Sequence, residues 1–228
     1  MKKIAVWVVM MMVFVTGASA EVGRPFTGLY IAVGTHESDG EFSLSHHGAK
    51  FSFGKFLGVP LNGNLTTYEV GYRFPVGHSN LRLGPNVTLH DGSIGGAKHW
   101  NGFNSSASFG VASDLRVSAG GELGLVFGEQ KRVYVYARAG VVATNLLMEL
   151  LVETPIGGWS NTKDGGALGA LYALGVQYKA TDRLAIDFKV SKMVFDADKA
   201  FGLGSMGSQS LEAELKQSTI GLTVSYNF

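Results

Sequence analysis

The last ten residues of the chain, 219–228, alternate between apolar or aromatic side chains and small or polar ones. Successive side chains of an extended strand point to opposite faces, so this run would carry one apolar and one polar face. The alternation continues up to Phe228, the final residue. The pattern therefore predicts a strand that separates an apolar environment from an aqueous one.

Seven earlier segments share this period of two. They span residues 26–35, 65–74, 81–90, 112–127, 133–141, 174–179 and 183–190. In the clearest, Tyr68 and Val70 share one face while Glu69 and Arg73 share the other. Most are near the roughly 9–11 residues that a tilted strand needs to cross a bilayer. Pro85 lies inside the third segment and cannot donate to a sheet ladder, so we expect a β-bulge there.

The connections between these segments alternate in length. Short ones span residues 75–80, 128–132 and 180–182, and long ones span 36–64, 91–111, 144–167 and 192–216. Outer-membrane barrels combine tight periplasmic turns with longer outside loops. A soluble barrel would bury its apolar face inside and has no need of four long loops on one rim. The pattern predicts an all-β fold: an eight-stranded antiparallel up-and-down transmembrane barrel with short periplasmic turns and four long extracellular loops.

The beginning of the chain is typical of a secretory signal peptide. Lys2 and Lys3 precede an apolar stretch, and Ala18 and Ala20 fit the small residues of a cleavage site. We expect residues 1–20 to be the signal and residues 21–228 to be the barrel domain. Export and a membrane-spanning barrel together predict the outer membrane of a Gram-negative bacterium as the location.

Composition narrows the function classes. Loss of Lys2 and Lys3 with the signal would change the formal charge from +1 to −1, so no basic field favours nucleic acid as a partner. The chain has no cysteine, which excludes disulfides, thiol nucleophiles and thiolate metal sites. After the signal, no apolar stretch reaches the roughly 18 residues of a membrane helix. We predict no cofactor and no metal.

The strand pattern places many charged side chains in the barrel interior. The predicted interior charge network comprises Glu69, Arg73, Arg82, Arg116, Glu122, Arg138, Lys179, Asp187 and Lys189, with Gln177 beside them. About eight strands enclose a space that side chains can fill, so we expect a paired polar plug. A gated ion path is the alternative. The predicted outward aromatic girdle and C-terminal signature comprise Phe74, Phe127, Tyr178, Tyr226 and Phe228.

Three motifs suggest chemistry, and each has a simpler reading. The glycine motif at 202–207 lacks the strand and helix of a nucleotide site. His36, His46 and His47, with Asp39 and Glu41, could gather a metal ion or belong to a hydrated loop. The run at 78–80, His-Ser-Asn, is similar to the His-x-Ser-Asn motif of lipid A deacylases. Its His and Ser are consecutive, however, and lie in a short turn.

Residues 175–193 read GVQYKATDRLAIDFKVSKM and resemble a hairpin of the small outer-membrane barrels related to OmpX, the OmpA membrane domain and the alphaproteobacterial immunogenic outer-membrane proteins. The matching residues are Gly175, Gln177, Tyr178, Thr181, Asp182, Asp187 and Phe188. The ending GLTVSYNF and the early GLYIAVG are also similar to that family. Where the family commonly carries an inward arginine beside Gly-Tyr, this chain has Glu122 and Gly124-Leu125. The resemblance implies the fold and the location rather than an activity.

Functional groups are expected in the long loops. The first loop combines Phe42, Phe51, Phe53, Phe56 and Leu57 with two lysines, and the third carries the apolar run 146–152 and Trp159. Such groups often mark partner contact, although the apolar run could equally extend two strands or lie on lipid. We predict a non-enzymatic monomer surrounded by outer-membrane lipid, with a structural or surface-interaction role and a host or surface ligand at the loops. A narrow porin-like channel and a lipid A-modifying enzyme are the alternatives.

Overall fold

The computed structural model describes residues 24–48, 53–102, 105–196 and 209–228. The expected signal peptide, with Ala18 and Ala20, lies outside the described residues, as does the glycine motif at 202–207. The side chains of 46–48, 53–56 and 209–211 also lie outside them. The predictions for these segments therefore remain predictions.

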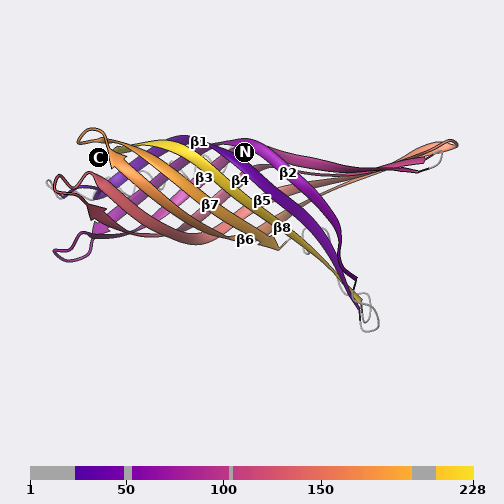
Figure 1. Cartoon of the computed structure of the whole chain (residues 1–228), viewed down its shortest axis with the longest axis horizontal. Coiled ribbons are helices and arrows are strands. Elements are labelled where there is room, and N and C mark those ends of the chain that lie inside the picture. Colours follow the sequence, from indigo (N-terminus) through magenta and orange to yellow (C-terminus); the bar gives the residue numbers. More distant parts are fainter. Residues whose placement is uncertain (1–23, 49–52, 103–104, 197–208) are drawn as a thin grey trace.

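Eight antiparallel strands form one closed barrel in sequence order, which confirms the predicted fold class (Figure 1). The strands are β1 Gly28–Gly48, β2 Phe53–Pro75, β3 Leu81–Gly102, β4 Ser105–Phe127, β5 Val133–Thr154, β6 Gly157–Lys179, β7 Leu184–Asp196 and β8 Gln209–Asn227. The first and last strands pair from Tyr30–Asn227 to Gly48–Gln209 and close the ring. No helix in the described ranges has the length and hydropathy to cross a bilayer.

The strands are longer than the sequence pattern suggested, at 13 to 23 residues each. Residues assigned to the four long loops are mostly paired β-strand, because β1 and β2 stay in register as far as Phe42–Val59 and Leu44–Leu57. Between β5 and β6 only Pro155 and Ile156 remain outside the strands. The connections β1–β2, β3–β4 and β5–β6 are therefore tall hairpins as far as the structure describes them, while the short turns and Phe228 lie together at the opposite end (Figure 1).

The sheet separates into two blades beyond the barrel (Figure 1). Among the described residues, the β2–β3 ladder ends at the pair Asn62–Gly95, and the β6–β7 ladder ends at Leu168–Asp196. We call the upper parts of β3 to β6 the four-strand blade; it comprises residues 95–102, 105–112, 146–154 and 157–167. The upper parts of β8, β1 and β2 form the three-strand blade, residues 209–217, 40–48 and 53–61.

The polarity of the two faces reverses along the strands. In the lower part of β8, Leu222 and Val224 face outward and Thr223 faces the buried interior. Higher on the same strand Lys216 faces outward and Leu215 is buried. Outward apolar groups suit a lipid environment, whereas outward charges with an apolar inner face suit water. The reversal therefore marks the outer boundary of the lipid-facing band.

The expected bulge at Pro85 is absent, and that prediction is wrong. Pro85 opposes Gly121 without a shift in register. The β3–β4 register shifts instead between Asp91 and Ile94, where Gly92 has a φ of 136°. A Cβ at Gly92 would lie 2.3 Å from the carbonyl oxygen of Asn64, so glycine suits both the conformation and the space at this irregularity.

The reversal of polarity predicts the labelling of single cysteines, which can be introduced one at a time because the chain has none. A membrane-impermeant maleimide should label Lys216→Cys in intact cells and leave Val224→Cys protected, because lipid covers the outward face there. Lys131→Cys, in the opposite turn, should react only after the outer membrane is opened. Reaction of Val224→Cys in intact cells would show that the lipid-facing band does not cover this part of β8.

Candidate functional site

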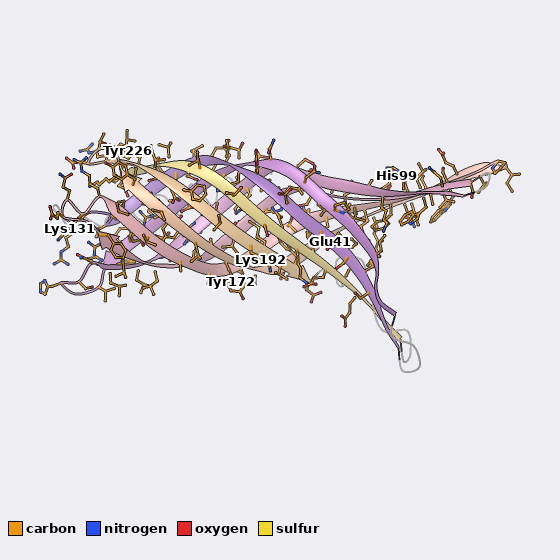
Figure 2. The ribbon with its side chains drawn as sticks, in the orientation of Figure 1. Glu41, His99, Lys131, Tyr172, Lys192 and Tyr226 are labelled. Carbon is orange, nitrogen blue, oxygen red and sulfur yellow. The ribbon has the colours of Figure 1, made fainter. Side chains whose placement is uncertain are left out.

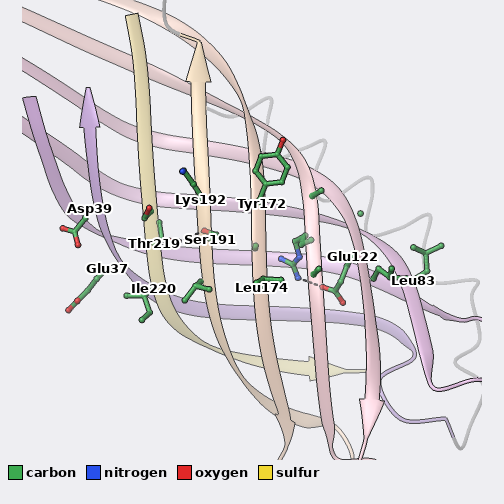
Figure 3. A pocket seen from close by; sticks show the side chains of 18 residues that line it. Glu37, Asp39, Leu83, Glu122, Tyr172, Leu174, Ser191, Lys192, Thr219 and Ile220 are labelled. Atoms are coloured by element: carbon green, nitrogen blue, oxygen red, sulfur yellow. Dashed lines mark hydrogen bonds and ion pairs between the residues drawn. The ribbon is translucent and has the colours of Figure 1, made fainter. Parts of the chain in front are cut away.

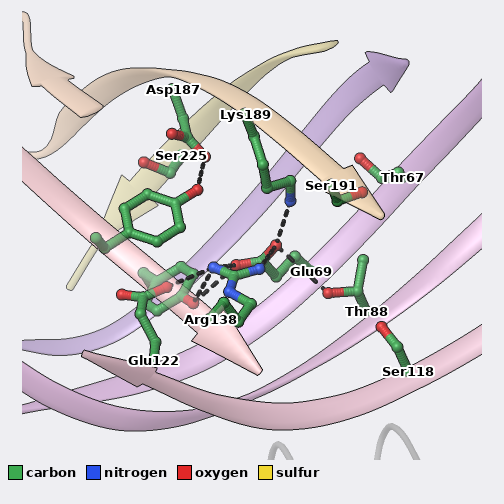
Figure 4. A network of polar contacts seen from close by, with 12 residues as sticks. Thr67, Glu69, Thr88, Ser118, Glu122, Arg138, Asp187, Lys189, Ser191 and Ser225 are labelled. Carbon is green, nitrogen blue, oxygen red and sulfur yellow. Dashed lines mark hydrogen bonds and ion pairs between the residues drawn. The ribbon is translucent and has the colours of Figure 1, made fainter. Parts of the chain in front are cut away.

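The centre of the interior is built around two buried carboxylates (Figure 4). Glu69 accepts hydrogen bonds from Arg138 Nη1 at 2.7 Å and Nη2 at 2.8 Å, a bidentate pair. It also accepts from Lys189 Nζ at 3.0 Å and from the Tyr30 hydroxyl at 2.7 Å. Such charge-assisted bonds are stronger than neutral ones and fix the positions of both partners.

Glu122 is the second centre of the same network. It accepts from Arg73 Nε at 2.7 Å, from the Tyr134 hydroxyl at 2.9 Å and from Arg138 Nη2. Arg138 therefore bridges both carboxylates. The Arg73 guanidinium also lies 3.9 Å from the centroid of the Tyr30 ring, a cation–π contact.

Every strand of the barrel contributes to this cluster. In strand order the contributors are Tyr30, Glu69 with Arg73, Thr88, Glu122, Arg138, Gln177, Lys189 with Asp187, and Ser225. Its three carboxylates and three cations balance formally. Charges removed from water are costly unless they are paired and hydrogen bonded, and these largely are. The sequence pattern placed Tyr30, Tyr134 and Tyr136 on the inner face but gave no sign that they would bind the acids.

Three of the predicted network residues are not joined to it among the described residues; Arg82 and Arg116 are buried as predicted, but the predicted pairing with carboxylates is wrong for them. Arg82 donates to the backbone oxygens of Pro25, Ser79 and Leu81 near the short turns. Lys179 is half-buried at the same rim. Arg116 is 1% exposed, yet its side chain donates only to the Ser113 carbonyl.

An aromatic stack closes the barrel at the end with the short turns. Phe26 stacks on Tyr134 with ring centroids 5.3 Å apart, and Tyr134 stacks on Tyr136 at 5.5 Å. The Tyr136 hydroxyl donates to Asp187 at 2.6 Å and so ties the stack to the charged layer. Phe26 was expected to begin the first strand, but it precedes β1 and its side chain is buried.

An apolar tier fills the other half of the interior. Its buried members are Phe42, Leu57, Val59, Leu61, Leu65, Ile94, Val111, Val142, Leu146, Ala167, Leu171, Met193, Phe195, Ala213 and Leu215. The rings of Phe42 and Phe109 stack 5.9 Å apart and join the bases of the two blades. Phe42 and Leu57 were expected to be exposed in a loop, so that expectation is wrong.

The described members of the candidate catalytic and metal groups do not come together, and the side chains of His46 and His47 lie outside the described residues. The Ser79 hydroxyl donates to the Val76 carbonyl at 2.6 Å and accepts from the Leu81 amide at 3.1 Å, so it stabilises a turn. His36 faces the interior beside Thr67, whereas Asp39 and Glu41 are exposed. The described residues contain no group of three metal-ligating side chains.

The outer wall carries the aromatic residues at the short-turn end. Phe74, Phe127, Tyr178 and Phe228 are exposed, and the half-buried Tyr226 accepts a hydrogen bond from Arg183 at 2.9 Å. This position suits the interfacial region of a bilayer.

A furrow of about 940 Å³ crosses the same wall (Figure 3). It follows a cross-strand row of outward residues from Glu37 on β1 to Leu83 on β3. The furrow is shallow-walled at Ala137 of this row and at Gly121 and Ala139 of the next row, whose side chains are small. It is therefore a pleat of the outer wall and not a cavity of the interior.

Removal of the bridging arginine should destabilise the barrel strongly. Arg138→Met leaves Glu69 and Glu122 with fewer cations, and loss of one partner in a buried pair costs about 3–5 kcal/mol. Urea unfolding of the refolded protein in lipid, followed by its gel mobility with and without heating, measures the change. Arg132→Met in an exposed turn should change stability by no more than about 0.5 kcal/mol. Equal effects of the two variants would contradict the proposed role of Arg138.

Arg116→Met should stabilise the barrel, in contrast to Arg138→Met. This arginine is buried without a carboxylate partner, and an apolar residue of similar length in such a position is often stabilising by about 1 kcal/mol or more. The same urea titration applies. A large loss of stability would show that the Arg116 guanidinium is better satisfied than its contacts indicate.

Solved structures of other outer-membrane proteins are similar to this chain. The outer membrane protease OmpT from Escherichia coli has a TM-score of 0.50 at 6% identity, covering 88% of this chain and 96% of that one. OprG from Pseudomonas aeruginosa has a TM-score of 0.45 at 12% identity, with 89% and 97% covered. Ail, the attachment invasion locus protein of Yersinia pestis, has a TM-score of 0.34 at 14% identity, with 86% and 98% covered.

At these identities a structural likeness concerns the fold and not the activity. No curated protein matches the chain. A family model for the outer membrane protein beta-barrel domain matches residues 7–228, nearly the whole sequence. The chain therefore belongs to the outer membrane protein β-barrel family.

Proposed function

We propose that this protein acts at the cell surface, with its barrel as an anchor and its extracellular blades as the binding part. The observation that carries the proposal is the filled interior. An aromatic stack, an ion network and an apolar tier follow one another along the barrel. The part of the molecule that can meet a ligand is therefore outside the barrel.

The filled interior argues against the narrow channel. Five charged side chains at the centre, Glu69, Arg73, Glu122, Arg138 and Lys189, form ion pairs with one another rather than line a path, and Asp187 accepts a hydrogen bond from Tyr136. An ion passing them would next meet the apolar tier around Phe42, Leu65 and Leu146, where desolvation is costly. A channel would need both layers to open.

The contacts of Ser79 argue against a lipid A-modifying enzyme. A nucleophilic serine needs a base within hydrogen-bond reach. Among the described residues, the Ser79 hydroxyl instead binds the backbone of its own turn and makes no hydrogen bond to His78. We therefore keep a non-enzymatic role in the proposal, together with a signal-cleaved monomer surrounded by outer-membrane lipid.

The blades support a surface role through their size and exposure. From Asn145 the β5–β6 hairpin continues for about ten residues to Ile156, about 30 Å of strand. Figure 2 places His99 on the four-strand blade and Lys131 and Tyr226 at the far end of the barrel. A projection of this length is well placed to meet a host or surface ligand.

Conductance offers the first test. The refolded protein in a planar lipid bilayer should show no discrete current steps, because the ion network and the apolar tier block the interior. Arg138→Met should remain silent as well, since the apolar tier persists in it. Regular steps from the unaltered protein would favour the channel and remove the main support for the surface role.

Shortening of the four-strand blade offers the second test. Residues 97–110 and 148–163 can each be replaced by Asn-Gly, which suits a two-residue hairpin turn, at the paired positions 96–111 and 147–164. Cells carrying this variant should attach to cultured epithelial cells about tenfold less than cells carrying the unaltered chain. A variant with alanine at Glu129 and Lys131, in a short turn, should attach normally. Unchanged attachment after shortening would contradict the proposal.

A further inference from the structure

The turn at the end of the β5–β6 hairpin, residues 154–158, carries no charged side chain, although Glu153 precedes it on the outward face. Ile156, at the turn between β5 and β6, is 100% exposed. No Asp, Glu, Lys or Arg occurs from Thr154 to Thr162 or from His99 to Ser113. A charge-free, exposed apolar tip is unusual for a segment that meets only water.

Two tryptophans flank the row of residues just below the tip. The cross-strand pairs are Trp100–Ala107, Ala107–Val152 and Val152–Trp159, so one row crosses all four strands. Trp100 is 41% exposed and Trp159 is 54% exposed. Between them lie only Ala107 and Val152, which leaves an apolar surface with an indole at each edge.

Lysines follow farther from the tip on the same face. Lys98 is two residues from Trp100, with its Nζ 5.8 Å from the indole centroid. Lys163 is four residues from Trp159 and is exposed. With about 3.3 Å per residue, these ammonium groups attach about 7 and 13 Å below the tryptophans.

Negative charge is confined to the other face of the blade. Glu149, Glu153 and Asp164 belong to the outward rows, and Glu153 accepts a hydrogen bond from Ser106 at 3.1 Å. The described residues of the inner face include no carboxylate. The inner face therefore suits an anionic surface.

We propose that the tip of the four-strand blade docks on an anionic phospholipid bilayer other than the one the barrel spans. From the tip downward the blade presents the apolar Ile156 in its turn, then two indoles and then two ammonium groups on its inner face. A bilayer presents hydrocarbon, an interfacial layer that favours tryptophan, and phosphate headgroups in the matching order. The inference deepens the proposed surface role and rests on it.

Two other occupants fit the same face less well. A glycan site needs several hydrogen-bonding groups, whereas Asn161 is the main amide of this face among its aliphatic neighbours. The barrel's own bilayer is out of reach, because the blade extends away from the barrel along the long axis of the molecule (Figure 1). A protein partner would need no ordered sequence of apolar, aromatic and basic layers.

Tryptophan fluorescence tests the proposal directly. The chain has three tryptophans, and Trp7 belongs to the expected signal, so a chain beginning at Glu21 reports only on Trp100 and Trp159. The protein is refolded into phosphatidylcholine nanodiscs and mixed with phosphatidylcholine–phosphatidylglycerol vesicles whose acyl chains are brominated. Emission should shift to the blue and be quenched. The same brominated lipids placed in the nanodisc should not quench.

Substitutions test the contributions of the apolar residue and of the two lysines separately. Ile156→Asp should lower vesicle binding about tenfold or more, and Ile156→Leu should preserve it. Lys98→Glu with Lys163→Glu should lower binding to the anionic vesicles about tenfold or more. Lys131→Glu, at the opposite end of the molecule, is the matched control and should bind as the unaltered chain does. Heat-modifiable gel mobility shows which variants have folded.

Three results would overturn the proposal. They are unquenched emission with brominated vesicles, quenching by the nanodisc lipids alone, and undiminished binding of a folded Ile156→Asp variant. Loss of cell attachment on shortening the blade, without any quenching by vesicles, would leave the surface role standing and make the ligand a protein or glycan. Quenching by vesicles, without any loss of cell attachment on shortening the blade, would support membrane docking and contradict the role in cell attachment.

Discussion

Hydrocarbon offers no hydrogen-bonding partner to a backbone amide, and the closure of β1 onto β8 satisfies that constraint here. The number of strands in the closed barrel, eight here, sets the size of the interior. An interior of that size is filled by side chains, and Glu69, Glu122 and Arg138 occupy its centre. The filled interior among the described residues follows from this geometry, and the proposed surface role of the blades rests on it.

Each strand alternates along its whole length but passes through two environments, lipid and water. In the lipid-facing band, the outer face is apolar and the inner face holds ions; beyond the band, Lys216 faces water while Leu215 and Phe42 pack inside. Because the two faces exchange their polarity, the strands can continue beyond the bilayer without a break in their hydrogen-bonded ladders. It also leaves the four-strand blade with an apolar inner face that is covered at its base and exposed at its tip.

Much of this could be predicted from the sequence, because a period of two fixes the face on which each side chain lies. Glu69 and Arg138 share the inner face for that reason. Their pairing depends on register between distant strands, which alternation does not specify. The shift between Ala112 and Arg116 is one such case, and Arg116 lies apart from the carboxylates. The segments 36–64 and 144–167 are strands that the sequence pattern predicts as loops, because their alternation continues with the opposite polarity.

The charged cluster also constrains how the molecule can be assembled. Its ion pairs join β2 to β4, β5 and β7, and β4 to β5, so all of them can form only when the strands from β2 to β7 have come together. A partly inserted sheet would hold guanidinium and carboxylate groups beside acyl chains, which is prohibitively unfavourable without water. The centre must therefore stay hydrated while the strands insert. Water leaves it last, when β8 joins β1 and the ion network is completed in one cooperative step.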